Sequence, residues 1–237
     1  SGQTFAGYIS SELILSDKWK STIGLRFENY LVKYTGENIE AIKFNNEKLI
    51  DTKDLYPSLN IIRTINDDKN LRISYSKTTA RPTFKEISAA QIYDPITERY
   101  FVGNPDVNPT YINNFDLRYE SYSDGNQIFA ISTFYKQFSD PIEITAFDAN
   151  QPSVFIVRNN EEASVYGIEL EYRKDILNND NHKLSLNLNT SVIQSIQTMS
   201  DAEYQGRLIS NPDKEIDESR ELQGQSPFMI NFGLSAN

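Results

Sequence analysis

Residue types that commonly carry catalysis are scarce in this sequence. It contains one histidine, His182, and no cysteine. A serine triad needs a histidine base held by a third group, and structural zinc needs four ligands, which are mainly cysteine and histidine. His182 lies in the polar run DILNNDNH at 175–182, where an exposed turn residue is expected. Neither a triad nor a zinc site is therefore predicted.

Paired or clustered carboxylates offer two other kinds of chemistry. Glu169 and Glu171 occupy alternate positions of a predicted strand, so their side chains share a face about 7 Å apart. Such a pair could hydrolyse a glycosidic bond, although a polar lining is the plainer interpretation. DPIEI at 140–144 and NPDKEIDESRE at 211–221 gather oxygens that suit calcium, but without EF-hand spacing. We predict no enzyme activity, no metal site and no cofactor.

Ligand binding is better supported than catalysis. The segment QIYDPITERYFV at 91–102 gathers aromatic rings and an arginine near a predicted loop tip, and FIVRNN at 155–160 supplies a second arginine. Such groups suit sugar faces, anionic chelates or peptides. The alternative is that these side chains pack the loop against its neighbours. The candidate ligand contacts are Tyr93, Arg99, Tyr100, Phe101 and Arg158.

Long strands must position these residues. In INNFDLRYESY at 112–122, Phe115 and Leu117 alternate with Asp116 and Arg118, the side-chain period of a β-strand. Similar alternation recurs along the chain, and no segment predicts a convincing helix or a fixed-period repeat. The predicted strands are 4–15, 18–34, 55–65, 71–79, 111–122, 127–138, 163–174, 183–194 and 228–236.

The connections between these strands alternate in length. Turns rich in Asp, Asn and Gly are predicted at 16–18, 66–70, 123–126 and 175–182. The long segments between them are 36–54, 80–110, 139–162 and 195–227. In an up-and-down meander this order places every short turn at one end and every long loop at the other. Outer-membrane barrels show that asymmetry.

Composition leaves two classes of fold open. The 237 residues are 38% hydrophobic, and no run approaches the 18 apolar residues of a transmembrane helix. A soluble sandwich would also use alternating strands, but long strands and the strict loop asymmetry favour a membrane barrel. The net charge of −10 argues against a nucleic-acid partner. The predicted fold is an all-β, antiparallel up-and-down meander.

Several motifs, in order, resemble the barrel of TonB-dependent outer-membrane receptors of the Bacteroidetes type. They begin with ISYSKTTARPTFKEIS, YFVGNPDVNPTYINNFDLRYESY and FAISTFYKQFSDPIEI, and they continue with ASVYGIELEYRK and LQGQSP. The likeness covers most of the chain from about residue 55. It implies that Gly103, Asn104 and Pro105 shape the end of an extracellular loop. Phe115, Leu117 and Tyr119 would face lipid, while Asp116, Arg118 and Glu120 would face the lumen.

The resemblance also carries expectations about function. The family has a barrel of about 22 strands around an N-terminal plug and imports scarce nutrients with energy from TonB. Residues 1–237 would supply one barrel segment of about nine strands, without the plug or the closing strands. The implied partners are outer-membrane lipid, TonB through the missing region, an extracellular nutrient and a surface lipoprotein. The alternatives are a non-transporting surface barrel or adhesin and a soluble β-sheet domain.

Overall fold

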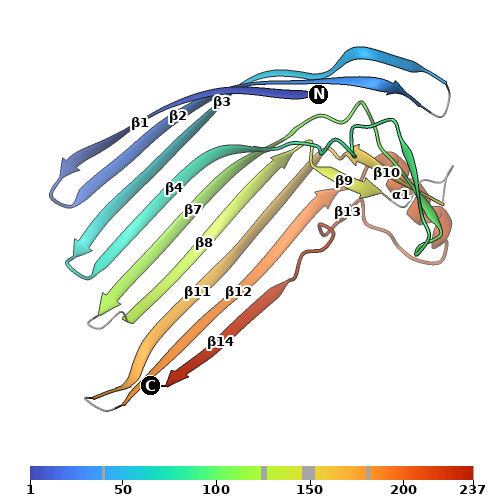
Figure 1. Cartoon of the computed structure of the whole chain (residues 1–237). Helices are drawn as coiled ribbons and strands as arrows, with labels where there is room; N and C mark the ends of the chain where they lie inside the picture. Colours follow the sequence, from blue (N-terminus) through green and yellow to red (C-terminus); the bar gives the residue numbers. More distant parts are fainter. Residues whose placement is uncertain (39–40, 124–126, 146–152, 180–181, 237) are drawn as a thin grey trace.

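A computed structural model describes residues 1–38, 41–123, 127–145, 153–179 and 182–236. Its main feature is one long antiparallel sheet whose strand order follows the chain (Figure 1). All nine predicted strands are present in it: β1 (Gly2–Ser16), β2 (Trp19–Glu37), β3 (Lys43–Asn66), β4 (Lys69–Ala80), β7 (Thr110–Ser123), β8 (Gln127–Ser139), β11 (Glu162–Asn178), β12 (Lys183–Thr198) and β14 (Phe228–Ala236). A two-residue strand, β13 (Ser219–Arg220), pairs with the end of β12.

The two ends of the sheet differ as predicted. The hairpins that join β1 to β2, β3 to β4, β7 to β8 and β11 to β12 lie at one end (Figure 1). The long connections lie at the other end. Parts of the predicted turns at 123–126 and 175–182, and of the loops at 36–54 and 139–162, fall on 124–126, 180–181, 39–40 and 146–152, outside the described residues.

The predicted alternation of apolar and polar side chains along the strands is confirmed, as on β7. Directly paired residues share a face, so Leu117 lies in one row with Ile73 and Thr133, while Arg118 lies in the next row with Arg72. The row that contains Leu117, and every second row from it, exposes large apolar side chains. The rows between them carry charged and amide groups. The apolar outer residues include Ile23, Leu25, Ile73, Phe115, Leu117, Ile131, Ile168, Val192, Phe228, Ile230 and Phe232.

Aromatic rows bound the apolar band on the outer face. In the upper row, toward the long loops, Tyr135 lies between Phe115 and Tyr166. In the lower row, toward the short turns, Phe129 lies between Ser121 and Tyr172. Phe115 and Ser121 are six residues apart on β7, or about 20 Å along a strand. Outer-membrane barrels carry an apolar band of similar height between aromatic girdles. The outer face therefore has the pattern of a lipid-facing surface.

The long loops contain strands that the list of strands predicted from the sequence does not include. Segments 80–110 and 139–162 contain β5 (Gln91–Asp94), β6 (Arg99–Val102), β9 (Ile142–Thr145) and β10 (Val154–Asn159). These four strands form a separate sheet, the loop sheet, in the order β5-β6-β10-β9, with β10 parallel to β6. Each strand is four to six residues long, too short to show a clear period in the sequence.

Two further expectations were wrong. Segment 36–54 is mostly strand, because β2 continues to Glu37 and β3 begins at Lys43. A helix, α1 (Asp201–Ser210), occupies part of the 195–227 loop. Ser200 is its N-cap, and the Ser200 side chain accepts a hydrogen bond from the Glu203 amide. Among the described residues, no helix is long and apolar enough to cross a membrane.

Candidate functional site

The candidate site is the loop sheet, which lies with α1 at the long-loop end (Figure 1). One face of the loop sheet packs into a hydrophobic core through Phe101 and Val157, against Val32 of β2 and Ile50 of β3. Ile87 and Val107, from the loops beside it, complete this core. The long loops are therefore anchored on the main sheet by buried apolar surface.

The structure divides the five predicted ligand contacts between different surroundings. Tyr93 and Tyr100 are paired across β5 and β6, with ring centroids 5.1 Å apart, and are 50% and 40% exposed. Arg99 lies on the other face, with its guanidinium carbon 5.1 Å from the centroid of the Phe155 ring. Phe101 is only 8% exposed and belongs to the core.

Arg158 lies apart from the β5–β6 hairpin. It stands on β10 opposite Glu143 of β9. Along β10 it is four residues from Val154, which pairs with Tyr100, a separation of about 13 Å. The structure therefore brings Tyr93 and Tyr100 together, and places Arg99 and Arg158 on separate parts of the loop sheet.

A hollow of about 340 Å³ opens on the core face of the loop sheet. Its rim carries charge: the Lys85 ammonium lies 4.2 Å from the centroid of the Phe101 ring. Asp94 is the acidic residue of the same hollow. Hydrogen bonds from the Ile96 amide and the Thr97 side chain lower the pKa of Asp94. No motif in the sequence marks Lys85, a single lysine in a turn. The lining residues are Lys85, Ile92, Asp94, Thr97, Phe101, Ile144 and Phe155.

The GNPD turn fastens the loop sheet to its surroundings. A Cβ added at Gly103 would lie 2.1 Å from the Ser88 carbonyl oxygen, so only glycine fits there. Asn104 donates its side-chain N–H to the Val157 carbonyl at 3.1 Å. Its own side-chain oxygen accepts from the Asp106 amide at 3.0 Å. The predicted role of this turn in shaping the loop end agrees with these contacts.

A buried ion cluster joins α1 to both sheets. Arg220 of β13 donates to Glu203 of α1 at 2.6 Å and to Glu143 of β9 at 2.5 Å. Arg207 donates to the same Glu203 carboxylate at 2.9 Å. Burial alone would raise the pKa of Glu203, but hydrogen bonds and charges from Arg220 and Arg207 outweigh it and lower the pKa. Sequence reasoning missed this cluster.

Ion pairs also line the inner face of the main sheet. Arg118 lies 2.7 Å from the Glu120 carboxylate and 2.8 Å from that of Glu171. Nearer the loops, Glu28 accepts from Arg26 at 2.5 Å and also from Arg81, whose guanidinium carbon lies 4.1 Å from the centroid of the Tyr30 ring. Charged side chains thus neutralise one another across neighbouring strands on this face.

Residues that could carry chemistry make turn or ion-pair contacts in the structure. His182 is exposed, and its amide donates to the Asn179 side chain at 2.8 Å. Glu171, one of the considered carboxylate pair, is held by Arg118, and Glu143 of the DPIEI segment is held by Arg220. Among the described residues, no group of three or more histidine, cysteine, aspartate or glutamate side chains could hold a metal ion.

An antiparallel meander with an apolar outer face, an ion-paired inner face and folded loops at one end defines the wall of an outer-membrane β-barrel. The chain belongs to the outer membrane protein beta-barrel family, whose family model matches residues 1–229. It is therefore a protein of the outer membrane. No curated protein matches the sequence.

Three solved structures share this fold. The siderophore receptor PirA from Pseudomonas aeruginosa is 16% identical, with a TM-score of 0.59, over 86% of this chain and 38% of that one. The FrpB iron transporter from Neisseria meningitidis is 16% identical, with a TM-score of 0.54, over 82% and 26%. The ferric enterobactin receptor PfeA from Pseudomonas aeruginosa is 14% identical, with a TM-score of 0.52, over 84% and 39%.

The chain spans well under half the length of each of these receptors. At such identities the likeness establishes the fold. The predicted resemblance is confirmed at that level: the chain has the architecture of part of a TonB-dependent receptor barrel.

Proposed function

We propose that this segment forms part of the wall and extracellular face of a receptor that takes up a nutrient across the outer membrane. The observation that carries the proposal is the loop sheet. Strands β6, β9 and β10 share a hydrophobic core with the barrel wall, and β5 pairs with β6, so the loop sheet holds a fixed surface above an ion-paired lumen. Rigidly presented loops are the usual place for ligand contacts on a β scaffold.

The proposed ligand contacts form two groups. Tyr93 and Tyr100 offer an exposed aromatic pair on one face of the loop sheet. Arg99 and Lys85 place cationic groups over aromatic rings on the other face, beside the hollow. Such groups suit an anionic ligand with a flat apolar body. Phe101 supports this surface from the core, and Arg158 is a secondary candidate.

Ferric siderophores are the ligand class to test first. The structural neighbours are a siderophore receptor, an iron transporter and a ferric enterobactin receptor. A ferric catecholate chelate combines negative charge with aromatic rings, which matches the chemistry of the loop surface. We further propose that TonB energises uptake and that a surface lipoprotein is a partner of the receptor, which a pull-down from native membranes would test.

The test is uptake by the native bacterium with and without this gene. Cells under iron limitation would receive radiolabelled iron on a panel of siderophores, with cobalamin, oligosaccharides and peptides as further panels. We expect the deletion to abolish accumulation of one ligand and a tonB deletion to have the same effect. Surface binding without accumulation would instead identify a non-transporting barrel or adhesin. Unchanged binding and uptake of every ligand would contradict the proposal.

A further inference from the structure

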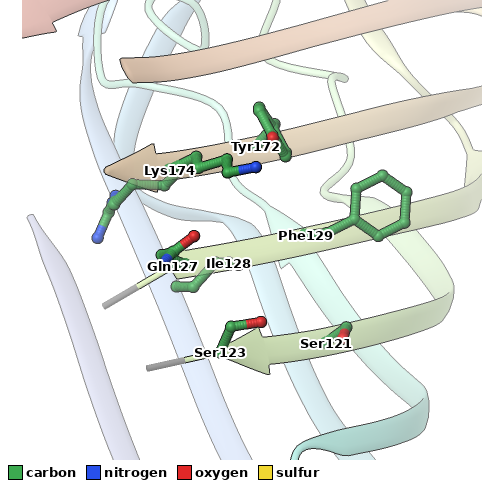
Figure 2. A pocket seen from close by; sticks show the side chains of 8 residues that line it. Ser121, Ser123, Gln127, Ile128, Phe129, Tyr172 and Lys174 are labelled. Atoms are coloured by element: carbon green, nitrogen blue, oxygen red, sulfur yellow. The ribbon is translucent and has the colours of Figure 1, made fainter. Parts of the chain in front are cut away.

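A second polar site lies at the opposite end of the molecule from the loop sheet. Beside the short turns, a hollow of about 160 Å³ opens between β7, β8 and β11 (Figure 2). Serine, glutamine and lysine side chains gather there with two aromatic rings. The lining residues are Ser121, Ser123, Gln127, Ile128, Phe129, Tyr172, Arg173 and Lys174.

Strand register places this hollow on the lipid-facing side. Ser121, Phe129 and Tyr172 are paired in the lower aromatic row of the outer face. Ser123 pairs with Gln127 one step nearer the turn. Arg173 pairs with Ile128, so Lys174, the next residue of β11, stands level with Gln127 on the outer face. The hollow therefore begins where the apolar band ends.

Lys174 is the unusual group in this hollow. It is a cation on the outer face, and its partner across β12 is Leu186. In the described part of the chain no carboxylate forms an ion pair with Lys174, since the neighbouring Asp175 is held by Lys183 at 3.2 Å and by Ser185 at 2.7 Å. Arg173 is directed elsewhere, because it donates to Asn187 at 2.9 Å.

An ammonium group at the edge of a lipid-facing band lies at the depth of the lipid headgroups, where it attracts an anion. Lysines there extend their apolar stems along the protein and keep the charge at the interface. The hydroxyls of Ser121 and Ser123 add donors suited to phosphate oxygens. Phe129 and Tyr172 supply an amphipathic surface of the kind found at bilayer interfaces.

We propose that this hollow binds the phosphate of a phospholipid in the periplasmic leaflet. Short turns of outer-membrane barrels face the periplasm, so that leaflet is the one in contact with the hollow. Lys174 pairs with the phosphate, the serine hydroxyls donate to it, and Phe129 and Tyr172 contact the glycerol and upper acyl chain. Binding is non-covalent and holds one lipid at the seam between the β7–β8 and β11–β12 hairpins.

The test is lipid retention by the complete native protein, purified from outer membranes in mild detergent. Native mass spectrometry would count bound lipids during titration with phosphatidylglycerol, with phosphatidylethanolamine and with inorganic phosphate. The variants are Lys174→Gln and the double variant Ser121→Ala with Ser123→Ala. Lys77→Gln is the matched control. Lys77 lies on the outer face near the long-loop end of β4, with its ammonium 4.9 Å from the centroid of the Tyr111 ring.

We expect one retained phospholipid in the native protein and a loss of about fivefold in phosphatidylglycerol affinity on Lys174→Gln, the effect of one cation near an anionic surface. The serine variant should weaken binding of both lipids, and Lys77→Gln should change neither. Equal affinities for the native protein and Lys174→Gln would overturn the proposal. Displacement of the lipid by millimolar inorganic phosphate would overturn the lipid assignment and indicate a free-phosphate site. Heat-modifiable gel mobility of each variant confirms that its barrel has folded.

Discussion

Arg118 and Glu171 are 53 positions apart in the sequence, yet a guanidinium nitrogen lies 2.8 Å from the carboxylate across strand β8. Arg118 also donates to Glu120 at 2.7 Å and to Ser132 at 3.4 Å. The side chains of Arg118 and Glu171 are each 29% exposed, so water screens the pair only in part. This interaction ties three neighbouring strands together on the inner face.

A double-mutant cycle at this pair should show a small coupling. We expect Arg118→Ala and Glu171→Ala to interact by about 0.5–1 kcal/mol in the free energy of unfolding of the native protein in lipid vesicles. The energy is modest because both groups remain partly hydrated. A coupling near zero would mean that the pair lines the lumen without stabilising the sheet.

An arginine placed on the outer face should prevent assembly. Ile168 lies in the middle of the apolar band, 56% exposed, between Thr133 and Val192. Ile168→Arg should destabilise the barrel by about 2–4 kcal/mol, the cost of a cation at the bilayer midplane. The matched change Asn189→Arg introduces the same charge on the inner face, opposite Glu171. Outer-membrane yield and heat-modifiable gel mobility measure the assembly of the two variants. Equal defects in assembly would contradict the assignment of the faces.

Substitution in the GNPD turn should release the loop sheet and leave the barrel intact. A methyl group at Gly103 would meet three backbone carbonyl oxygens within 3.0 Å, so the turn must move. Gly103→Ala should therefore increase proteolysis of the loops on whole cells by about tenfold, as expected for a local loss near 1.4 kcal/mol. Gly7→Ala, where an added Cβ meets nothing within 4 Å, is the control. Unchanged proteolysis of Gly103→Ala would show that the turn adapts.

Replacement of Arg99 and Tyr100 together tests the proposed ligand surface. Tyr100 is exposed, and Arg99 lies over the Phe155 ring, so neither holds the core of the loop sheet. We expect the Arg99→Ala, Tyr100→Ala variant to reach the outer membrane normally and to lose at least about tenfold in ligand affinity. Phe155→Leu controls for the loss of the ring contact alone. Normal uptake by the double variant would exclude both residues from the site.

The main sheet could be predicted from sequence because its strands are long and two-faced. Phe115, Leu117 and Tyr119 repeat at the side-chain period of a strand, and the short turns mark each reversal. The loop sheet could not be predicted in the same way, since Ile142 to Thr145 is too short for a period to appear and its pairing with β10 is set by tertiary contacts.

The candidate site was only partly accessible to sequence reasoning. Tyr93 and Tyr100 could be grouped from the sequence because they are close along the chain, and the structure pairs their rings. Glu143 and Arg220 are 77 positions apart, so their ion pair has no local signature. Helix α1 did have one, the Ser200-x-x-Glu203 pattern of a capping box, but its apolar face is too weak to support a helix prediction.

Acid should detach α1 from the loop sheet. The folded pKa of Glu203 lies below its ordinary value of 4.5, because the arginines outweigh burial. A depressed carboxyl pKa stabilises the fold above the unfolded value, and this stabilisation is lost as pH falls through the folded pKa. Protonation of Glu203 also leaves Arg220 and Arg207 short of negative charge in a buried place. Amide hydrogen exchange in α1 should therefore accelerate, relative to β12, below about pH 4.5.

The variant Glu203→Gln imitates the protonated carboxyl at neutral pH. It should raise α1 exchange at pH 7 by one to two orders of magnitude, about 1.4–3 kcal/mol, since Arg220 retains Glu143 as a partner. The same variant should lose most of the acid dependence, because the titrating group is gone. Glu215→Gln, an exposed position in the following loop, should behave as the native protein. Acid-dependent exchange that persists in Glu203→Gln would assign the effect to another carboxylate, with Glu143 the next to test.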